Sequence, residues 1–146
     1  MDRVEPGAAE GWRTFDHTGD LGLEVWAASP ERLFALAAVA LLAQQVEAAG
    51  GAGEKRVTLA LSGGDAADLL VHFLSTALLE AELRGATWTR AEVRSLTPTS
   101  IEATLEGPRR DPARHTYLRE IKAVSHHDLA LDLTPGACSC RLVLDI

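Results

Sequence analysis

The sequence is poor in the features that stabilise small secreted proteins or that cross membranes. Two cysteines among 146 residues cannot build a disulfide framework. No run of about 20 uncharged apolar residues is present, which excludes an ordinary membrane-spanning helix. Three of residues 1–5 are charged and no apolar run follows them, so we expect no secretion signal. These absences favour a cytoplasmic protein that does not contact a membrane.

Amide side chains and lysine are also scarce. The chain has no Asn, two Gln, and twelve Arg against two Lys. This usage is typical both of proteins from hot-growing sources and of GC-rich genomes, and the sequence leaves both explanations open. It makes Lys55 and Lys122 unusual, because the chain otherwise uses arginine as its cation.

The charge balance limits the partners that the chain can bind. The formal net charge is −7. Proteins that bind nucleic acid through its phosphates are usually basic, so we expect no direct binding to DNA and no broad contact with RNA. A negative surface instead suits a metal cation or a basic protein partner. Apolar residues make up 47% of the chain and charged residues 24%, which is ordinary for a globular domain.

The length and the pattern of apolar residues predict one domain. We expect a flexible tail over residues 1–11 and a single domain over 12–146. Apolar and polar residues alternate over 20–27, which predicts a half-buried strand. Ser29 before Pro30 is typical of a helix start, and this helix is expected to stop at 50–51, where two glycines follow each other.

The rest of the chain is expected to be one further helix and mostly strands. A helix follows the Ser62–Asp65 turn and ends at Gly85, and residues 107–116 form a loop. Extended runs are expected around 57–61, 87–96, 100–106, 118–126, 129–133 and 138–146. This order predicts an α+β fold with two layers, a largely antiparallel sheet that carries two helices on one face.

Two carboxylates fall on the polar phase of predicted strands. Asp20 begins one strand, and Asp145 lies on the polar phase of the last strand, next to Ile146. Together with the main-chain carboxylate of Ile146, these oxygens could form a site for a hard cation such as Ca²⁺, Mg²⁺ or Mn²⁺. The alternative is that both are solvated strand-end residues, which is the commoner situation for an isolated Asp.

The segment 120–128 holds the densest group of polar side chains. It includes Glu120, Lys122, His126 and His127, and the alternative to a site is an exposed strand. Zinc could in principle be held by these histidines together with Cys138 and Cys140. The Cys-x-Cys spacing matches no ordinary structural zinc site, and the apolar phase of both cysteines favours buried thiols.

Neither of the remaining polar features indicates an enzyme. Asp16 and His17 precede the first predicted strand and are expected to cap a turn, and His72 is expected to face solvent. The sequence has no phosphate loop, no His-Glu-x-x-His zinc motif and no Gly-x-Ser-x-Gly nucleophile motif. A metal-dependent phosphate enzyme is therefore disfavoured.

Four stretches of the sequence resemble the archease family. The segment 16–22 reads Asp-His-Thr-Gly-Asp-Leu-Gly, against Asp-His-Thr-Ala-Asp-Ile-Gly in the family. The helix start at 29–34 matches that of the family. The segment 120–129 resembles the family's Glu-Ile-Lys-Ala-Val-Thr-Tyr-His stretch. The residues at 142–146 resemble the aliphatic segment ending in Asp-Ile that closes the family's sequences. The resemblance runs from about residue 12 to the last residue.

The resemblance implies an accessory protein and not a catalyst. Archease stimulates the GTP-dependent guanylylation and the multiple turnover of RtcB-type RNA ligases, which act in tRNA splicing and RNA repair. The family implies an SHS2-like module and a metal site, here Asp20, Asp145 and Ile146, with Ca²⁺ the expected ion and Mg²⁺ or Mn²⁺ as alternatives. Contact with tRNA would then be indirect, through the ligase.

The same resemblance assigns a role in partner activation to the central segment. The matching residues are Glu120, Lys122 and His127, while Asp16 and His17 support the first motif. Two positions depart from the family: His72 stands where an acidic residue is common, and His126 stands where Tyr or Trp is common, so the partner surface is expected to differ there. A chaperone-like protein-binding module with a structural metal is the alternative function.

Overall fold

The computed structural model describes residues 9–146, and within that range the chain forms nine strands and two helices. In chain order these are β1 (Gly11–His17), β2 (Asp20–Ala27), α1 (Pro30–Gln45), β3 (Val46–Glu47), β4 (Lys55–Ser62), α2 (Ala66–Arg84), β5 (Arg90–Thr97), β6 (Ser100–Gly107), β7 (Thr116–Tyr117), β8 (Ala123–Asp132) and β9 (Cys138–Asp145). Most of the expected tail, residues 1–8, lies outside the described residues, and its last residue, Gly11, begins β1.

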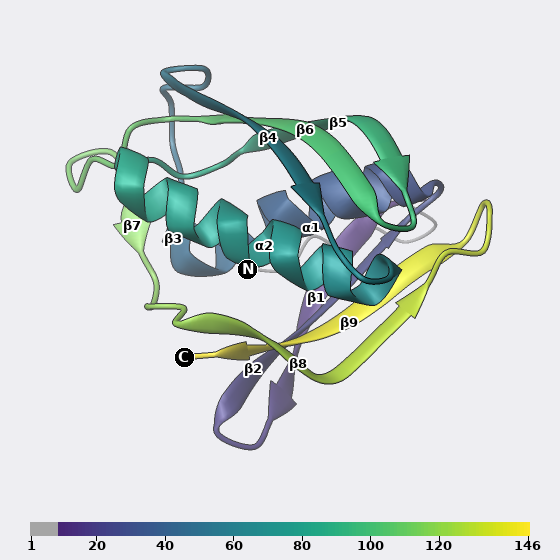
Figure 1. Ribbon diagram of the computed structural model, residues 1–146. Helices are drawn as coiled ribbons and strands as arrows, with labels where there is room; N and C mark the ends of the chain where they lie inside the picture. The colour runs from purple at the N-terminus through teal and green to yellow at the C-terminus, as the bar shows by residue number, and fades with distance from the viewer. Residues whose placement is uncertain (1–8) are drawn as a thin grey trace.

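The strands form two larger antiparallel sheets with the helix pair between them (Figure 1). One sheet has the order β1-β2-β9-β8 and the other β4-β6-β5, while β3 and β7 form a short separate ladder. Helix α1 contacts β2 and β5, and α2 contacts β8 and β4. The predicted α+β class with antiparallel pairing and two helices is confirmed. The strands are divided between two sheets, each of which has the helices on one face.

The division into two sheets explains why α1 is buried on nearly every side. The helix begins as predicted, with the Ser29 hydroxyl accepting a hydrogen bond from the Arg32 N–H at 3.2 Å. Its buried residues are not confined to one stripe, since Phe34, Ala35 and Ala38 are buried as well as Leu33, Ala37 and Leu41. A helix with a sheet on either side has no broad solvent face, so its apolar residues surround it.

The structure differs from the prediction in three elements. Helix α1 ends at Gln45 and not at the glycine pair, because Val46 is extended and pairs with Tyr117. Strand β1 was not predicted. Asp16 and His17 belong to it and cap no turn; it is an edge strand with half-exposed residues on both faces, so its apolar alternation is weak. The runs predicted at 118–126 and 129–133 are joined in one irregular strand, β8, which begins only at Ala123.

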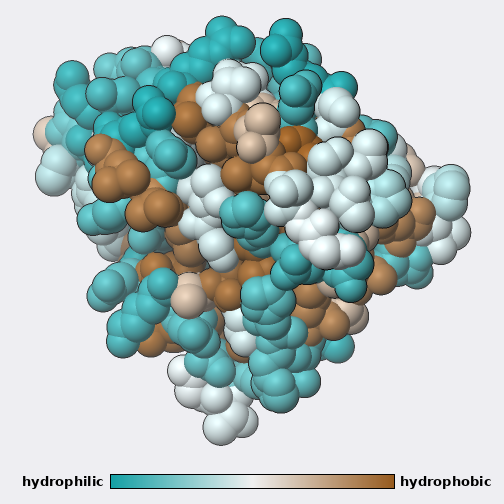
Figure 2. Space-filling model, viewed as in Figure 1, coloured by the Kyte–Doolittle hydropathy of each residue, from teal (hydrophilic) through white to brown (hydrophobic). Residues whose placement is uncertain are grey.

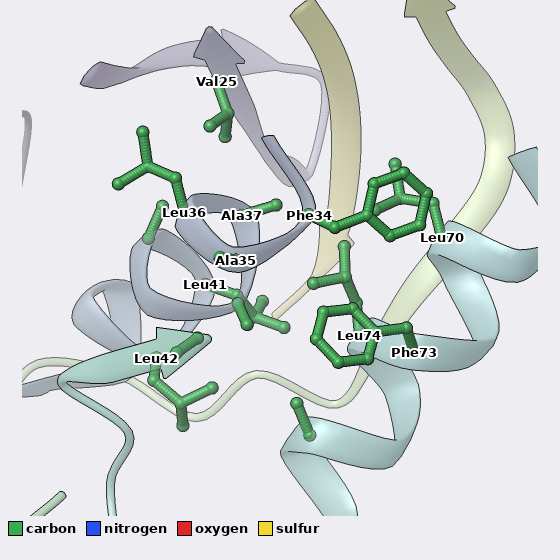
Figure 3. Close-up of a cluster of buried hydrophobic side chains, with 14 of the residues drawn as sticks. Val25, Phe34, Ala35, Leu36, Ala37, Leu41, Leu42, Leu70, Phe73 and Leu74 are labelled. Carbon is green, nitrogen blue, oxygen red and sulfur yellow. The ribbon is translucent and has the colours of Figure 1, made fainter. Parts of the chain in front are cut away.

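The core between the sheets contains a contact between the two helices. The rings of Phe34 on α1 and Phe73 on α2 have centroids 6.2 Å apart and are tilted by 33° (Figure 3). Both side chains are fully buried, and Leu70 and Leu74 lie beside them in the same cluster. This cluster fixes the position of α2, on which β8 packs.

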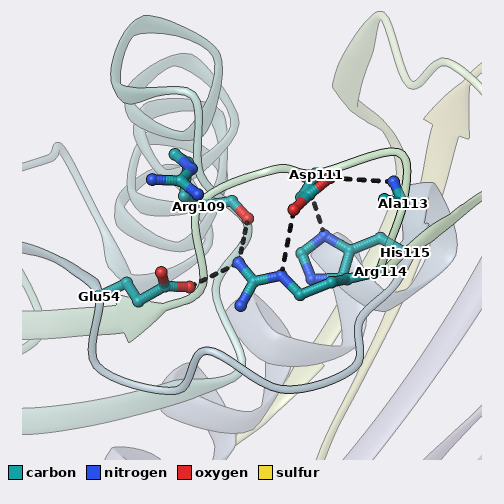
Figure 4. A network of polar contacts seen from close by, with 6 residues as sticks. All are labelled: Glu54, Arg109, Asp111, Ala113, Arg114 and His115. Carbon is teal, nitrogen blue, oxygen red and sulfur yellow. Dashed lines mark hydrogen bonds and ion pairs between the residues drawn. The ribbon is translucent and has the colours of Figure 1, made fainter.

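A polar network holds the long connection between β6 and β7 (Figure 4). The Arg114 guanidinium donates to Glu54 Oε1 at 2.6 Å and to the Arg109 carbonyl at 3.3 Å, and its Nε lies 3.4 Å from Asp111 Oδ2. The hydrogen bond from Arg114 is the main reason why the pKa of Glu54 lies below its usual value. The network ties the chain before β7 to the loop before β4, and so sets the course of the segment that leads to β8.

Candidate functional site

The β1–β2 hairpin brings the first motif to one end of the β1-β2-β9-β8 sheet. His17 and Asp20 pair across the two-residue turn, and Gly19 in that turn has φ +74°. His17 Nδ1 lies 3.7 Å from Asp20 Oδ2. Gly22 continues the motif, and a Cβ there would overlap the ring of Phe15, over which the Arg141 guanidinium lies at 4.3 Å.

Replacing Gly19 by alanine should destabilise the protein by about 1 kcal/mol, because an L side chain is strained at positive φ. Nothing lies within 4 Å of an added Cβ, so the effect would come from backbone strain alone. Thermal or urea denaturation measures it. Gly64→Ala is the matched control, since Gly64 is not at positive φ; equal stability of Gly19→Ala and wild type would contradict the assignment of strain to this turn.

Asp20 and Asp145 reach the same end of the sheet from neighbouring strands. Leu21 pairs with Leu144, so Asp20 and Asp145 lie one step beyond this pair, on the side of the sheet away from the helices. Asp145 also pairs with Ala123 of β8, and its carbonyl accepts a hydrogen bond from the Lys122 N–H at 2.8 Å. The fold therefore brings Asp20, Asp145 and the start of β8 together, although the two carboxylates lie 125 positions apart in the sequence.

An irregular stretch of β8 adds two more polar residues to this region. Ser125 pairs with Val143 and Ala130 with Arg141, so residues 126–129 stand opposite Leu142 alone. Asp128 has φ +58°, and its Oδ2 lies 3.2 Å from His17 Nε2 and 3.3 Å from His127 Nε2. His17 thus stands between the carboxylates of Asp20 and Asp128. The contribution of Asp128 was missed from the sequence, because the bulge that turns it toward β1 leaves no periodic signal.

The two adjacent histidines turn to different neighbours, as expected for neighbouring residues of a strand. His127 faces Asp128, whereas His126 Nε2 lies 3.3 Å from Asp68 Oδ1 on the first turn of α2. Asp68 also accepts a hydrogen bond from the Gly64 N–H at 2.8 Å. His72 is exposed, as predicted, and its Nδ1–H donates to the Ser62 carbonyl at 2.8 Å.

The contacts of Asp68 predict a pH-dependent contribution to stability. The Gly64 N–H, and after it His126, lower the pKa of Asp68 below its usual 3.8. Since the folded pKa is depressed, the contribution is present above about pH 4 and is lost as the pH falls through the lowered pKa. We expect His126→Ala to raise the pKa of Asp68 in an NMR titration while leaving it below 3.8. A pKa at or above 3.8 in that variant would contradict the leading role of the Gly64 N–H.

The remaining predicted residues lie near the site without joining one cluster. Glu120 and Lys122 belong to the segment between β7 and β8 and line a groove beside α2. Asp16 is exposed and pairs with Leu21. Ile146 follows Asp145 and is 44% exposed. The 120–128 segment is thus divided: its beginning faces α2, and its end faces the β1–β2 hairpin.

The donor atoms at this end of the sheet suit a hard cation. Asp20 and Asp145 supply carboxylate oxygens, which Ca²⁺, Mg²⁺ and Mn²⁺ prefer. Within residues 9–146, no group of three or more His, Cys, Asp and Glu side chains is arranged to hold a metal ion. A cation here would therefore need main-chain oxygens, such as those of Ile146, or water as further ligands.

The two cysteines are not available as ligands. Cys138 and Cys140 are buried free thiols on the helix-facing side of β9, as predicted. Burial raises the pKa of Cys140 to about 12, and Cys138 Sγ donates to the Thr134 carbonyl at 3.3 Å. A neutral buried thiol neither binds zinc readily nor acts as a nucleophile.

Comparison with known proteins decides the family. The model of the Archease protein family (MTH1598/TM1083) matches residues 12–146. The chain belongs to the archease family. It is 29% identical to protein archease of Methanopyrus kandleri over 138 residues, which is 92% of this chain and 99% of that protein. It is 27% identical to protein archease of Pyrococcus abyssi over 139 residues, 92% of this chain and 98% of that protein.

A solved structure supports the archease fold. The solution structure of Methanobacterium thermoautotrophicum protein 1598 superimposes with a TM-score of 0.70 at 20% identity, covering 92% of this chain and 98% of that one. Family membership gives the chain an accessory role in RNA processing, and archease proteins are not themselves catalytic enzymes. Among residues 9–146, neither helix combines the length and apolar character needed to cross a membrane.

Proposed function

We propose that this chain activates an RtcB-type RNA ligase, by promoting its guanylylation with GTP and its repeated turnover in tRNA splicing and RNA repair. The observation that carries the proposal is the register of β2, β9 and β8, which gathers Asp20, Asp145 and the main chain of Lys122 at one sheet end. These residues match the family motifs found in the sequence. The chain itself would act in the cytoplasm and would contact RNA only through the ligase.

The carboxylates of Asp20 and Asp145 and a main-chain oxygen of Ile146 would hold a divalent cation, with Ca²⁺ the first candidate and Mg²⁺ or Mn²⁺ the alternatives. When bound, such an ion supplies positive charge that stabilises phosphate oxygens during nucleotide transfer. Lys122 would add the positive charge of its ammonium near this end of the sheet, since its main-chain N–H binds the Asp145 carbonyl. His17 would orient Asp20, and His127 with Asp128 would support His17 from the β8 bulge.

The experiment is ligase guanylylation with GTP and a divalent metal, with and without this chain at substoichiometric amounts. We expect faster formation of guanylylated ligase, and more ligase labelled than the amount of chain added, because an activator is released after each event. If a cognate ligase gains nothing in rate or turnover, the proposal fails. The chaperone-like alternative, with a structural metal, would then remain if added Ca²⁺ still raises the melting temperature of wild type more than that of Asp145→Ala.

A further inference from the structure

The exposed large apolar side chains of the described residues gather on one side of the molecule. Four such side chains are found in residues 9–146: Leu79 and Leu83 on α2, Tyr117 on β7, and Ile146, with exposures of 56%, 70%, 46% and 44%. Leu79 and Leu83 are four residues apart and share one face of α2. The C-terminal half of α2, β7 and the chain end lie on the same side in Figure 1.

A groove lies beside α2 and is lined by one of these side chains, Leu79. It has a volume of about 500 Å³, with Leu78 and Leu79 of α2 on one wall and Glu120–Ala123 on the other. Figure 2 shows hydrophobic residues exposed on this side of the molecule, over the end of α2 and below it. Tyr117 lies three residues before the second wall, and Ile146 follows Asp145, whose carbonyl binds the Lys122 N–H. Exposed apolar patches rimmed by polar residues mark interaction surfaces.

The charges around the groove leave its apolar floor as the main source of affinity. Glu82 on the rim is paired with Arg110 at 3.0 Å, and Arg119 donates to the Gln44 carbonyl at 2.6 Å. Glu120 and Lys122 carry opposite charges on the same wall. No strong local field of one sign remains, so an occupant would bind chiefly through apolar side chains seated between α2 and this wall.

The net charge of the whole chain favours a basic protein over a second copy of this chain as the partner in the groove. A second copy would bring two molecules of charge −7 together, which opposes association. A partner with a basic surface would instead be attracted over a longer range, with an association rate that falls as salt is added. The net charge and the apolar groove together favour a basic protein that presents apolar anchor residues.

We infer that this groove is the docking surface for the partner ligase, which would insert apolar side chains from a basic patch between Leu78 and Leu79 of α2 and the Glu120–Ala123 wall. Leu83 would extend this surface on the same face of α2. This inference rests on the proposed function for the identity of the partner. Lys122 lines the groove, and its main-chain N–H donates a hydrogen bond to the Asp145 carbonyl. A protein bound in the groove would therefore lie beside the proposed cation site. Docking through α2 would then depend on residues other than Asp20 and Asp145, while Lys122 would belong to both the groove and the activation surface.

The test measures binding of the chain to the cognate ligase, by calorimetry or biolayer interferometry, alongside guanylylation. The double variant Leu79→Ser/Leu83→Ser removes the apolar face, and Ser75→Arg places bulk and positive charge in the groove. Each is expected to weaken binding by about tenfold or more, the usual effect of disrupting an interface hot spot. Ser95→Arg is the matched control, because Ser95 is also exposed but lies on β5 in the other sheet.

The outcomes separate this inference from the proposed function. Loss of binding in both groove variants, with normal binding by Ser95→Arg, supports docking in the groove. Wild-type affinity in both groove variants overturns it, and leaves the proposed function intact if the wild type still stimulates the ligase. An association rate that does not fall with salt contradicts the basic partner surface. If the wild type neither binds nor stimulates the ligase, the proposed function is wrong, and so is the assignment of the ligase as the partner that docks in the groove.

Discussion

Lys122→Met should reduce the stimulated rate of ligase guanylylation by about tenfold or more, the size of effect seen when one group that stabilises developing charge is removed. Methionine keeps the length of the side chain and removes its charge. The hydrogen bond from residue 122 to the Asp145 carbonyl uses the main-chain N–H, so the substitution leaves it in place. The cation ligands should therefore be undisturbed, and affinity for Ca²⁺ should stay equal or increase, because a nearby positive charge is lost.

The sequence offers a matched control for this variant. Lys55 is the only other lysine of the chain and lies at the start of β4, in the other sheet. Lys55→Met makes the same change in charge and should leave stimulation unchanged. Calcium titration by calorimetry and the guanylylation assay are run on both variants. Normal stimulation by Lys122→Met would remove Lys122 from the activation surface, and loss of Ca²⁺ binding in that variant would show that its effect is structural.

Phe34→Ala should lower the free energy of unfolding by about 3–5 kcal/mol, the usual cost of removing a buried aromatic side chain. Phe34 is fully buried and faces Phe73 across the helix pair, so its removal leaves a cavity between the two sheets that neither can easily close. Since many domains have a total stability of roughly 5–15 kcal/mol, this variant should be close to unfolding on warming. Urea denaturation followed by circular dichroism measures the change.

Leu83→Ala is the control for that experiment. Leu83 is a large apolar residue of α2 but is 70% exposed, and alanine is a better helix former than leucine, so its removal should change stability by less than about 0.5 kcal/mol. Similar losses in Phe34→Ala and Leu83→Ala would mean that the helix pair does not form the central core, contrary to the arrangement in Figure 3.

The predictable parts of the fold are those with strong local signals. The Ser29-Pro30 start of α1 and the Asp65 and Gly85 ends of α2 follow from capping chemistry, which depends on neighbouring residues alone. The early end of α1 was not predictable in the same way. Val46 leaves the helix because Tyr117, far along the chain, offers it a strand partner, and such a long-range pairing has no signature near residue 46.

The candidate site likewise has parts that the sequence predicted and parts that it did not. The polar phase of Asp20 and Asp145 was visible in the sequence, and sheet register then places them together. The place of Asp128 beside His17 depends on a bulge opposite Leu142, and neither the size of a bulge nor its direction follows from a period of two. The groove beside α2 was also not predicted. Whether Leu79 and Leu83 are exposed depends on which other elements pack against that face of α2, and the sequence pattern of the helix does not show this.

The central claim is that activation comes from the Asp20–Asp145 end of the sheet, and one comparison tests it most directly. Guanylylation of the cognate ligase is measured with substoichiometric wild-type chain, with Asp20→Asn, and with Glu102→Gln, an exposed carboxylate of β6 in the other sheet. The account predicts equal stimulation by wild type and Glu102→Gln, and a rate with folded Asp20→Asn equal to that of ligase alone. Full stimulation by Asp20→Asn would contradict it.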